Sequence, residues 1–173
     1  FNEIWLYDDR EVNLAGNLSI GDHPHCTNIG FYSRFQLLDT PKQGGGVVGI
    51  VSGPEPYADQ LFELFLKIAS RSIQKMTIIC PERLAVSVPS NIEFIHDWEL
   101  GDQAILSADL ILSRNGYSTL MDLTVLGKKA ILIATPGQSE QMYLSERNGL
   151  ESVLQTTDEE TFQGASLAAI EQL

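Results

Sequence analysis

Basic residues are scarce in this chain of 173 residues: 11 Lys and Arg stand against 23 Asp and Glu, a formal net charge of -12. A surface this negative repels nucleic-acid phosphates and anionic lipid, and no Lys/Arg-rich tract offsets it. We therefore expect no nucleic-acid partner. Any anionic ligand must be held locally, by a few arginines and by oriented backbone amides.

Cysteine and long apolar runs are also nearly absent. Cys26 and Cys80 are far apart and have no cysteine framework around them, which is typical of two thiols in a reducing compartment. No apolar run approaches the roughly 20 residues that span a bilayer, and no signal peptide is visible. We expect a cytoplasmic protein and leave contact with a membrane open. Because the chain begins with Phe1, in a stretch typical of a buried strand, we expect it to be a piece of a longer protein.

Motifs for metals, cofactors and nucleophiles are lacking too. The run DHPHC (22–26) holds potential ligands, but they lie too close together across a proline to converge, and no second cluster supplies the rest. We therefore expect no metal site. The turn SGPEP (52–56) lacks the G-x-G-x-x-G pattern of a dinucleotide fingerprint, and we expect no cofactor. No Ser/His/Asp or Cys/His spacing suggests a nucleophile, so the catalytic residues are unknown.

What the chain does contain, from residue 47 on, is a regular alternation of strand and helix patterns. β-branched apolar runs predict buried strands, and apolar residues at spacings near 3.6 predict helices. The expected strands are 47–52, 76–80, 92–96, 109–113 and 129–134, and the expected helices include 57–73, 100–108 and 158–173. This order predicts an α/β fold, a Rossmann-like doubly wound parallel sheet covered on both faces.

Residues 1–40 differ from the rest. Two short apolar pieces, EIWLY (3–7) and NIGFY (28–32), are separated by a polar stretch and predict two strands joined by a loop. A Pro- and Gly-rich run, DTPKQGGG (39–46), then predicts a flexible turn or linker. We expect residues 1–40 to be the tail of a preceding N-terminal domain with linker strands, and residues 41–173 to be a separate α/β domain.

The clearest candidate site is the run SRNGYSTLMD (113–122), which turns from a strand into a helix. Asn115, Gly116, Ser118 and Thr119 open that helix, where free amides and the helix dipole favour a pyrophosphate. Asp122 lies one helical turn beyond Ser118 and could accept hydrogen bonds from ribose hydroxyls. An equally simple interpretation is that Ser118 or Thr119 caps the helix and Asp122 merely favours its dipole.

Two further turns follow strand ends. Gln138 and Gln141 open the next helix on one face, and their amides suit sugar hydroxyls, although solvated glutamines are the simpler alternative. Ser52 and Gly53 lie in SGPEP (52–56), where backbone amides could meet a phosphate. Every strand-to-helix unit needs such a turn, so a structural role is as good an interpretation there.

Together these residues resemble the C-terminal, donor-binding half of GT-B glycosyltransferases. The closest likeness is to the MurG-like family (glycosyltransferase family 28, C-terminal type), which transfers N-acetylglucosamine from UDP. The resemblance covers roughly residues 28–150, with the motifs in the family's order. It implies that Arg34, in IGFYSR, contacts the diphosphate, and that Ser52 and Gly53 lie at the nucleotide. FIHD (94–97) is similar to the segment whose main chain reads uracil, near Ile95.

The resemblance also assigns the later motifs. Arg114, Asn115 and Gly116 match the family's Arg-Ser-Gly run, and Ser118 and Thr119 would supply phosphate contacts. The family's ribose-binding acid falls on Asp122, and its sugar-reading glutamine falls on Gln141. The chain departs from the family at the phosphate loop, where it has Pro54, Glu55 and Pro56. It departs again at Met142 and Ser145, where the family favours Gln and Asn.

The resemblance implies a glycosyltransferase fragment that holds a UDP-sugar for inverting, metal-independent transfer. The general base and the acceptor site would lie in an N-terminal domain of the same protein, so this fragment alone would catalyse little. Two alternatives remain open. One is a UDP-sugar hydrolase or 2-epimerase with the same cradle, and the other is a non-catalytic domain that binds a nucleotide sugar.

Overall fold

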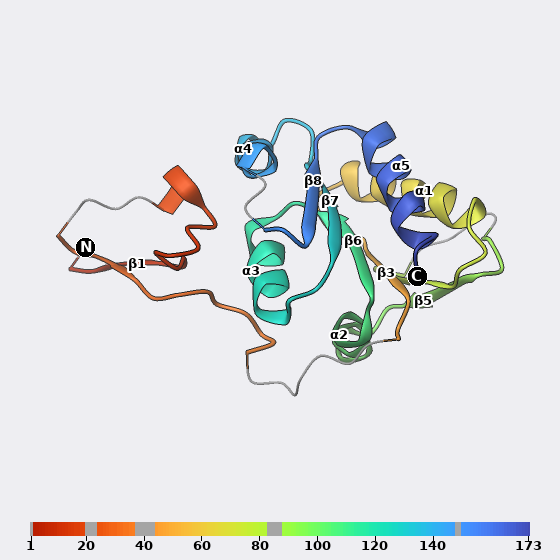
Figure 1. The fold of residues 1–173 in the computed structure, drawn as a ribbon, viewed down its shortest axis with the longest axis horizontal. Coiled ribbons are helices and arrows are strands. Elements are labelled where there is room, and N and C mark those ends of the chain that lie inside the picture. Colours follow the sequence, from red (N-terminus) through yellow and green to blue (C-terminus); the bar gives the residue numbers. More distant parts are fainter. Residues whose placement is uncertain (1, 20–23, 37–43, 83–87, 148–149) are drawn as a thin grey trace.

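The computed structural model describes residues 2–19, 24–36, 44–82, 88–147 and 150–173, and its centre is a six-stranded parallel sheet (Figure 1). The strands lie in the order β5-β4-β3-β6-β7-β8. Their bounds are β3 Val47–Ile50, β4 Met76–Ile79, β5 Ile92–Ile95, β6 Leu110–Arg114, β7 Ala130–Ile133 and β8 Val153–Thr156. The predicted doubly wound α/β fold is confirmed.

The strand order reverses between β3 and β6, which pair with each other although β4 and β5 separate them in the sequence. The chain therefore winds outward from this point in both directions, and sheets of this kind bind ligands in the crevice outside the carboxyl ends of the strands there. Because every strand pair is parallel, all six carboxyl ends meet at one edge of the sheet. We call this the carboxyl edge.

Helices cover both faces of the sheet (Figure 1). One core cluster joins α1 (Tyr57–Ser70) and α5 (Glu159–Ile170) to the first face. A second cluster joins α2 (Trp98–Ser107), α3 (Tyr117–Leu126) and α4 (Ser139–Arg147) to the other. Each strand-to-helix turn thus opens at the carboxyl edge.

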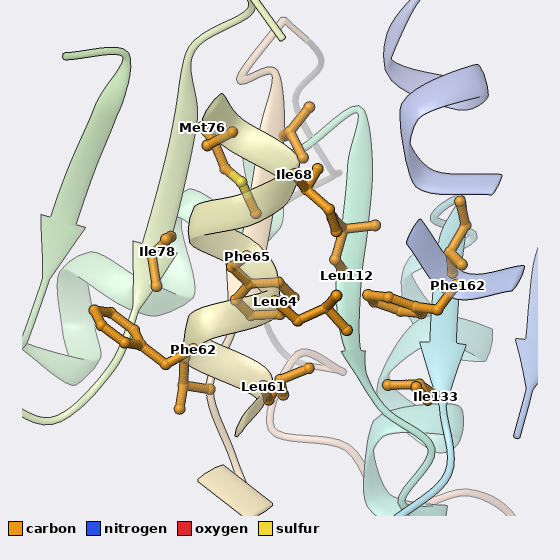
Figure 2. Close-up of a cluster of buried hydrophobic side chains, with 14 of the residues drawn as sticks. Leu61, Phe62, Leu64, Phe65, Ile68, Met76, Ile78, Leu112, Ile133 and Phe162 are labelled. Atoms are coloured by element: carbon orange, nitrogen blue, oxygen red, sulfur yellow. The ribbon is translucent and has the colours of Figure 1, made fainter. Parts of the chain in front are cut away.

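Phe65 of α1 lies at the centre of the first cluster (Figure 2). It is fully buried, and its ring centroid is 6.5 Å from that of Phe162 on α5. Gly49 of β3 makes room for it, since a Cβ at position 49 would lie 2.9 Å from the Phe65 ring. Because Phe65 lies so close to Gly49, α1 packs tightly against β3. This packing positions the turn between them, which contains Ser52 and Gly53.

Several element boundaries differ from the sequence expectation. α1 ends at Ser70, three residues before the predicted end at 73. α2 begins at Trp98 rather than at 100, because the Asp97 carboxylate caps it by accepting a hydrogen bond from the Leu100 amide at 3.0 Å. The edge strand β8 was not predicted at all. Its last two residues, Gln155 and Thr156, are polar but buried, which hid the apolar signal of a strand.

The N-terminal segment, residues 2–36, also differs. β1 (Ile4–Leu6) falls within the predicted strand 3–7, but its partner β2 is Cys26–Asn28 rather than 28–32. Gly30 has a φ of 81°, which takes the chain out of the extended conformation just after β2. The two strands form a separate parallel pair. The predicted boundary at 40 and most of the linker 39–46 lie outside the described residues, so the division into domains stays a prediction.

A buried carboxylate orders the loop that follows β1. Asp8 accepts hydrogen bonds from the Leu14 and Ala15 amides, both at 2.9 Å, and from the Ser19 hydroxyl at 2.6 Å. The short helix η1 (Gly16–Ser19) closes this loop. The loop then docks beside α3 and α4 (Figure 1). The Tyr117 hydroxyl donates to the Tyr7 carbonyl at 2.5 Å, and Arg147 donates to the Asn13 carbonyl at 2.8 Å.

Candidate functional site

The N-terminus of α3 opens at the carboxyl edge without a side-chain cap. Its N-cap is Gly116, in an extended conformation, and no side chain accepts a cap hydrogen bond there. Neither Ser118 nor Thr119 occupies the cap position, so the alternative interpretation, in which one of them caps the helix, is wrong. The first-turn amides of α3 carry the positive end of the helix dipole and are suited to an anion.

A pocket of roughly 180 Å³ lies beside this helix start, and we call it the carboxyl-edge pocket. It brings together five of the twelve predicted site residues, namely Arg34, Ser52, Ser118, Thr119 and Asp122. The remaining lining is apolar or aromatic and consists of Phe35, Ile50, Val51, Trp98, Ile105, Ile111, Leu123 and Leu126. A few polar groups converging in an apolar hollow are typical of a small-ligand site.

Asp122 is the acid of this pocket, and residues 33 and 34 engage both of its oxygens. The Ser33 hydroxyl donates to Oδ1 at 2.6 Å, and Arg34 Nη1 lies 3.3 Å from Oδ2. Burial raises the pKa of the Asp122 carboxyl, and the hydrogen bond from Ser33 and the charge of Arg34 oppose that shift only in part. Each carboxylate oxygen has a second lone pair, so Asp122 can accept further hydrogen bonds.

Arg114, predicted to contact the donor, points into the protein instead of into the pocket. It is 5% exposed, and its terminal nitrogens donate to the Tyr57 carbonyl at 2.9 Å and the Ala134 carbonyl at 3.2 Å. Burial lowers the pKa of this guanidinium, while the charge of Glu159 opposes the shift. Arg114 thus ties the start of α1 to the end of β7. The sequence motif was visible, but which face of β6 the side chain takes was not.

Asn115 is likewise enclosed and does not line the pocket. Its amide nitrogen donates to the Gln141 carbonyl at 3.1 Å and to the Ser145 hydroxyl at 2.8 Å. Ser145, a departure from the family pattern, is therefore the partner of a buried amide. Gln141 accepts a hydrogen bond from the Thr135 amide at 2.7 Å, and its own amide nitrogen donates to Gln138 at 2.5 Å. The two glutamines lie together at the start of α4, as their spacing predicted.

The remaining predicted residues also lie at the carboxyl edge. Ile95 ends β5, and its carbonyl accepts a hydrogen bond from the Cys80 amide at 3.1 Å. Gly53 has a φ of 102°, a conformation that strongly favours glycine, in the turn between β3 and α1. In the same turn Glu55 accepts a hydrogen bond from the Asp59 amide at 3.3 Å, so its carboxylate caps the first turn of α1.

The sequence interpretation missed three residues of the site. Trp98 lines the pocket from the first position of α2 and is 70% exposed, which is rare for so large an apolar side chain. Asp102, one turn further on, accepts a hydrogen bond from Arg34 Nε at 2.8 Å. Ser33 holds Asp122. The signal for Trp98 was available, because an aromatic residue directly after a strand-end turn of this sheet faces the carboxyl edge.

Two negative findings bear on the described residues. Across these ranges, no group of three or more His, Cys, Asp or Glu side chains is placed to hold a metal ion. No helix in the same ranges is long and apolar enough to cross a membrane. Of the run DHPHC, residues 22 and 23 lie outside the described part of the chain.

The strand order defines the class of fold: this is a doubly wound α/β domain like those of the GT-B glycosyltransferases. The glycosyltransferase of kitacinnamycin has a TM-score of 0.64 over 91% of this chain and 44% of its own, at 14% identity. The spinosyn rhamnosyltransferase SpnG, complexed with thymidine diphosphate, has a TM-score of 0.59 over 92% of this chain and 47% of its own, at 15% identity. At such identities the likeness shows the fold.

The sequence comparison identifies the family. The model of the glycosyltransferase family 28 C-terminal domain matches residues 64–157, and the chain belongs to this family. It is also similar to UDP-N-acetylglucosamine--N-acetylmuramyl-(pentapeptide) pyrophosphoryl-undecaprenol N-acetylglucosamine transferase 1 of Bacillus cereus, with 28% identity over 110 residues. That match covers 57% of this chain and 29% of the Bacillus protein. The chain therefore spans less than a third of this relative and less than half of the two structures above.

Proposed function

We propose that the carboxyl-edge pocket binds the nucleoside diphosphate of a nucleotide sugar, with UDP as the nucleotide, and that this domain presents the sugar for inverting transfer without a metal. The observation that carries the proposal is a convergence. An uncapped helix start, one arginine and one carboxylate meet in one pocket, at the reversal of strand order. The family membership supports the choice of ligand, as does the UDP-sugar in the name of the Bacillus relative.

Each group has a part to play in that complex. The α3 amides and Arg34 meet the diphosphate, and Asp122 accepts hydrogen bonds from the ribose hydroxyls. Trp98 offers an exposed aromatic face against which a nucleobase can stack. Gln138 and Gln141, already joined to each other, face the sugar. As the bond to the sugar breaks, the same amides and guanidinium stabilise the charge on the departing diphosphate.

The acceptor and the general base belong, in this proposal, to an N-terminal domain of a longer polypeptide. The N-terminal segment supports this, because it exposes several large apolar side chains around β1 and β2: Ile4, Trp5, Tyr7, Ile29 and Tyr32. An exposed apolar patch of this kind usually marks a contact surface. The greater length of the relatives is consistent with such a domain.

Calorimetric titration with UDP tests the proposal. We expect UDP to bind and uridine to bind far more weakly, because uridine lacks the anion that the helix start and Arg34 attract. Arg34→Gln should weaken UDP binding by roughly 10- to 100-fold, the loss of a charged hydrogen bond worth about 1.5–3 kcal/mol.

The matched control is Arg71→Gln, at the other end of α1 and away from the carboxyl edge. It removes the same charge and should leave UDP affinity unchanged. Absence of heat and of any thermal shift with UDP would contradict the proposed function, as would equal losses in the two variants.

A further inference from the structure

Arg34 lies between two carboxylates at the carboxyl-edge pocket. Its Nε donates to Asp102 of α2 at 2.8 Å, and its Nη1 reaches Asp122 of α3 at 3.3 Å. The guanidinium carbon lies 4.6 Å from the centre of the Phe35 ring, and Phe35 is buried in the core. Arg34 is therefore contacted by α2, by α3 and by the ring of its own neighbour Phe35.

This arrangement has a consequence for an anionic ligand. One guanidinium and two carboxylates leave the group with a charge of -1, in a chain whose net charge is already -12. The shorter of the two contacts, to Asp102, occupies the Nε–H. A phosphate that binds Arg34 must therefore either displace the guanidinium from Asp102 or share the guanidinium with that carboxylate.

We propose that Asp102 is a positioning residue that acts through Arg34 and holds down the affinity of the pocket for the donor's diphosphate. The inference rests on the proposed function and goes beyond it, because Asp102 has no part in binding the nucleotide itself. Asp122 does have such a part. Asp102 lies on the outer side of the arginine, and its side chain is 28% exposed against 18% for Asp122.

The role makes chemical sense for a transferase. A pocket that paired its arginine freely with diphosphate would also retain the nucleoside diphosphate left after the sugar has gone. The free nucleotide has a terminal phosphate, with a second pKa near 6, and so carries more negative charge than the intact sugar nucleotide at neutral pH. The attraction between the guanidinium and a phosphate grows with the charge of the phosphate, so competition from Asp102 for that guanidinium weakens binding of the more highly charged species more. Asp102 thus lowers the affinity for the nucleoside diphosphate product more than the affinity for the sugar nucleotide, which favours release of the product.

The test compares the affinities of UDP, a UDP-sugar and uridine for the wild-type protein and for Asp102→Asn. We expect the variant to bind UDP about three- to tenfold more tightly, in the range of one ion pair in a partly exposed network. Binding of the UDP-sugar should tighten less, and binding of uridine should not change. Asp102→Ala, which removes the acceptor as well as the charge, should behave in the same way.

Two controls separate this mechanism from a general charge effect. Glu99→Gln removes the same charge from an exposed position of the same helix and should leave UDP affinity unchanged. In an Arg34→Gln background, Asp102→Asn should no longer tighten UDP binding, because the arginine through which Asp102 acts is gone. Equal tightening in the two backgrounds would overturn the inference.

The possible failures are distinguishable. If the wild-type protein does not bind UDP at all, the proposed function falls and this inference falls with it. If the wild-type protein binds UDP but Asp102→Asn binds it equally or more weakly, the proposed function stands and only the role of Asp102 is refuted.

Discussion

Replacing Phe65 by alanine should lower the free energy of unfolding by roughly 3–5 kcal/mol, the usual cost of removing a fully buried phenyl ring from a core. The cost arises from lost contacts on two sides, since the ring packs over Gly49 of the central strand and beside Phe162 (Figure 2). The surrounding sheet and helices cannot collapse into a space of that size. Urea denaturation followed by circular dichroism measures the change.

Ile73→Ala is the matched control for this prediction. Ile73 is 97% exposed just beyond α1, so its truncation should change the free energy of unfolding by less than about 0.5 kcal/mol. Phe65→Leu keeps most of the apolar volume and guards against a variant that does not fold. The loss of unfolding free energy in Phe65→Leu should fall between those in Phe65→Ala and Ile73→Ala. Similar losses in Phe65→Ala and Ile73→Ala would show that α1 is not packed as described.

Asp122→Asn should reduce UDP affinity by roughly 10- to 100-fold. It should also reduce the preference of the pocket for ribose over deoxyribose in the nucleotide. In the proposed complex the carboxylate accepts hydrogen bonds from both ribose hydroxyls, each worth about 1.5–3 kcal/mol because the acceptor is charged. The wild-type protein should therefore bind UDP roughly 10- to 100-fold more tightly than 2′-deoxy-UDP. Calorimetry with the two ligands measures both effects.

The ligand pair separates a ribose contact from a general disturbance of the pocket. Asparagine keeps the shape of Asp122 and can still accept one hydrogen bond from Ser33, so the turn at 33–36 should stay in place. If Asp122 reads the ribose, the preference for UDP over its deoxy analogue shrinks in the variant. If the preference is unchanged while both affinities fall, the carboxylate does not contact the 2′-hydroxyl.

The fold could be predicted from the sequence because its central strands β3, β6 and β7 are buried on both faces. Runs such as VVGI and AILI carry no polar residue, and helical periodicity separates them. The same reasoning explains the missed strand β8, where the side chains of Gln155 and Thr156 are polar yet enclosed. Sequence patterns show only whether side chains are polar or apolar, whereas a strand joins a sheet through the hydrogen bonds of its backbone. A strand with polar side chains is therefore easily missed.

The site could be predicted only in part. The turns that follow the strands were visible, and parallel strands bring them to one edge whatever their details. Successive side chains of a strand point to opposite faces of the sheet, so a shift of one residue decides whether a side chain faces a ligand or the protein. The side chain of Arg114 faces the protein, where it donates to two backbone carbonyls. Contacts between distant segments, such as Arg34 with Asp102, have no local sequence signal at all.

The most direct test of the central claim is a titration of the isotopically labelled protein with UDP, followed by NMR of the backbone amides and the arginine side chains. We expect the largest chemical-shift changes on the amides from Gly116 to Thr119 and on the Arg34 guanidinium, and a change on the Trp98 indole as well. Shifts centred on the opposite end of the sheet, around the hollow between α1 and residues 88–91, would contradict it.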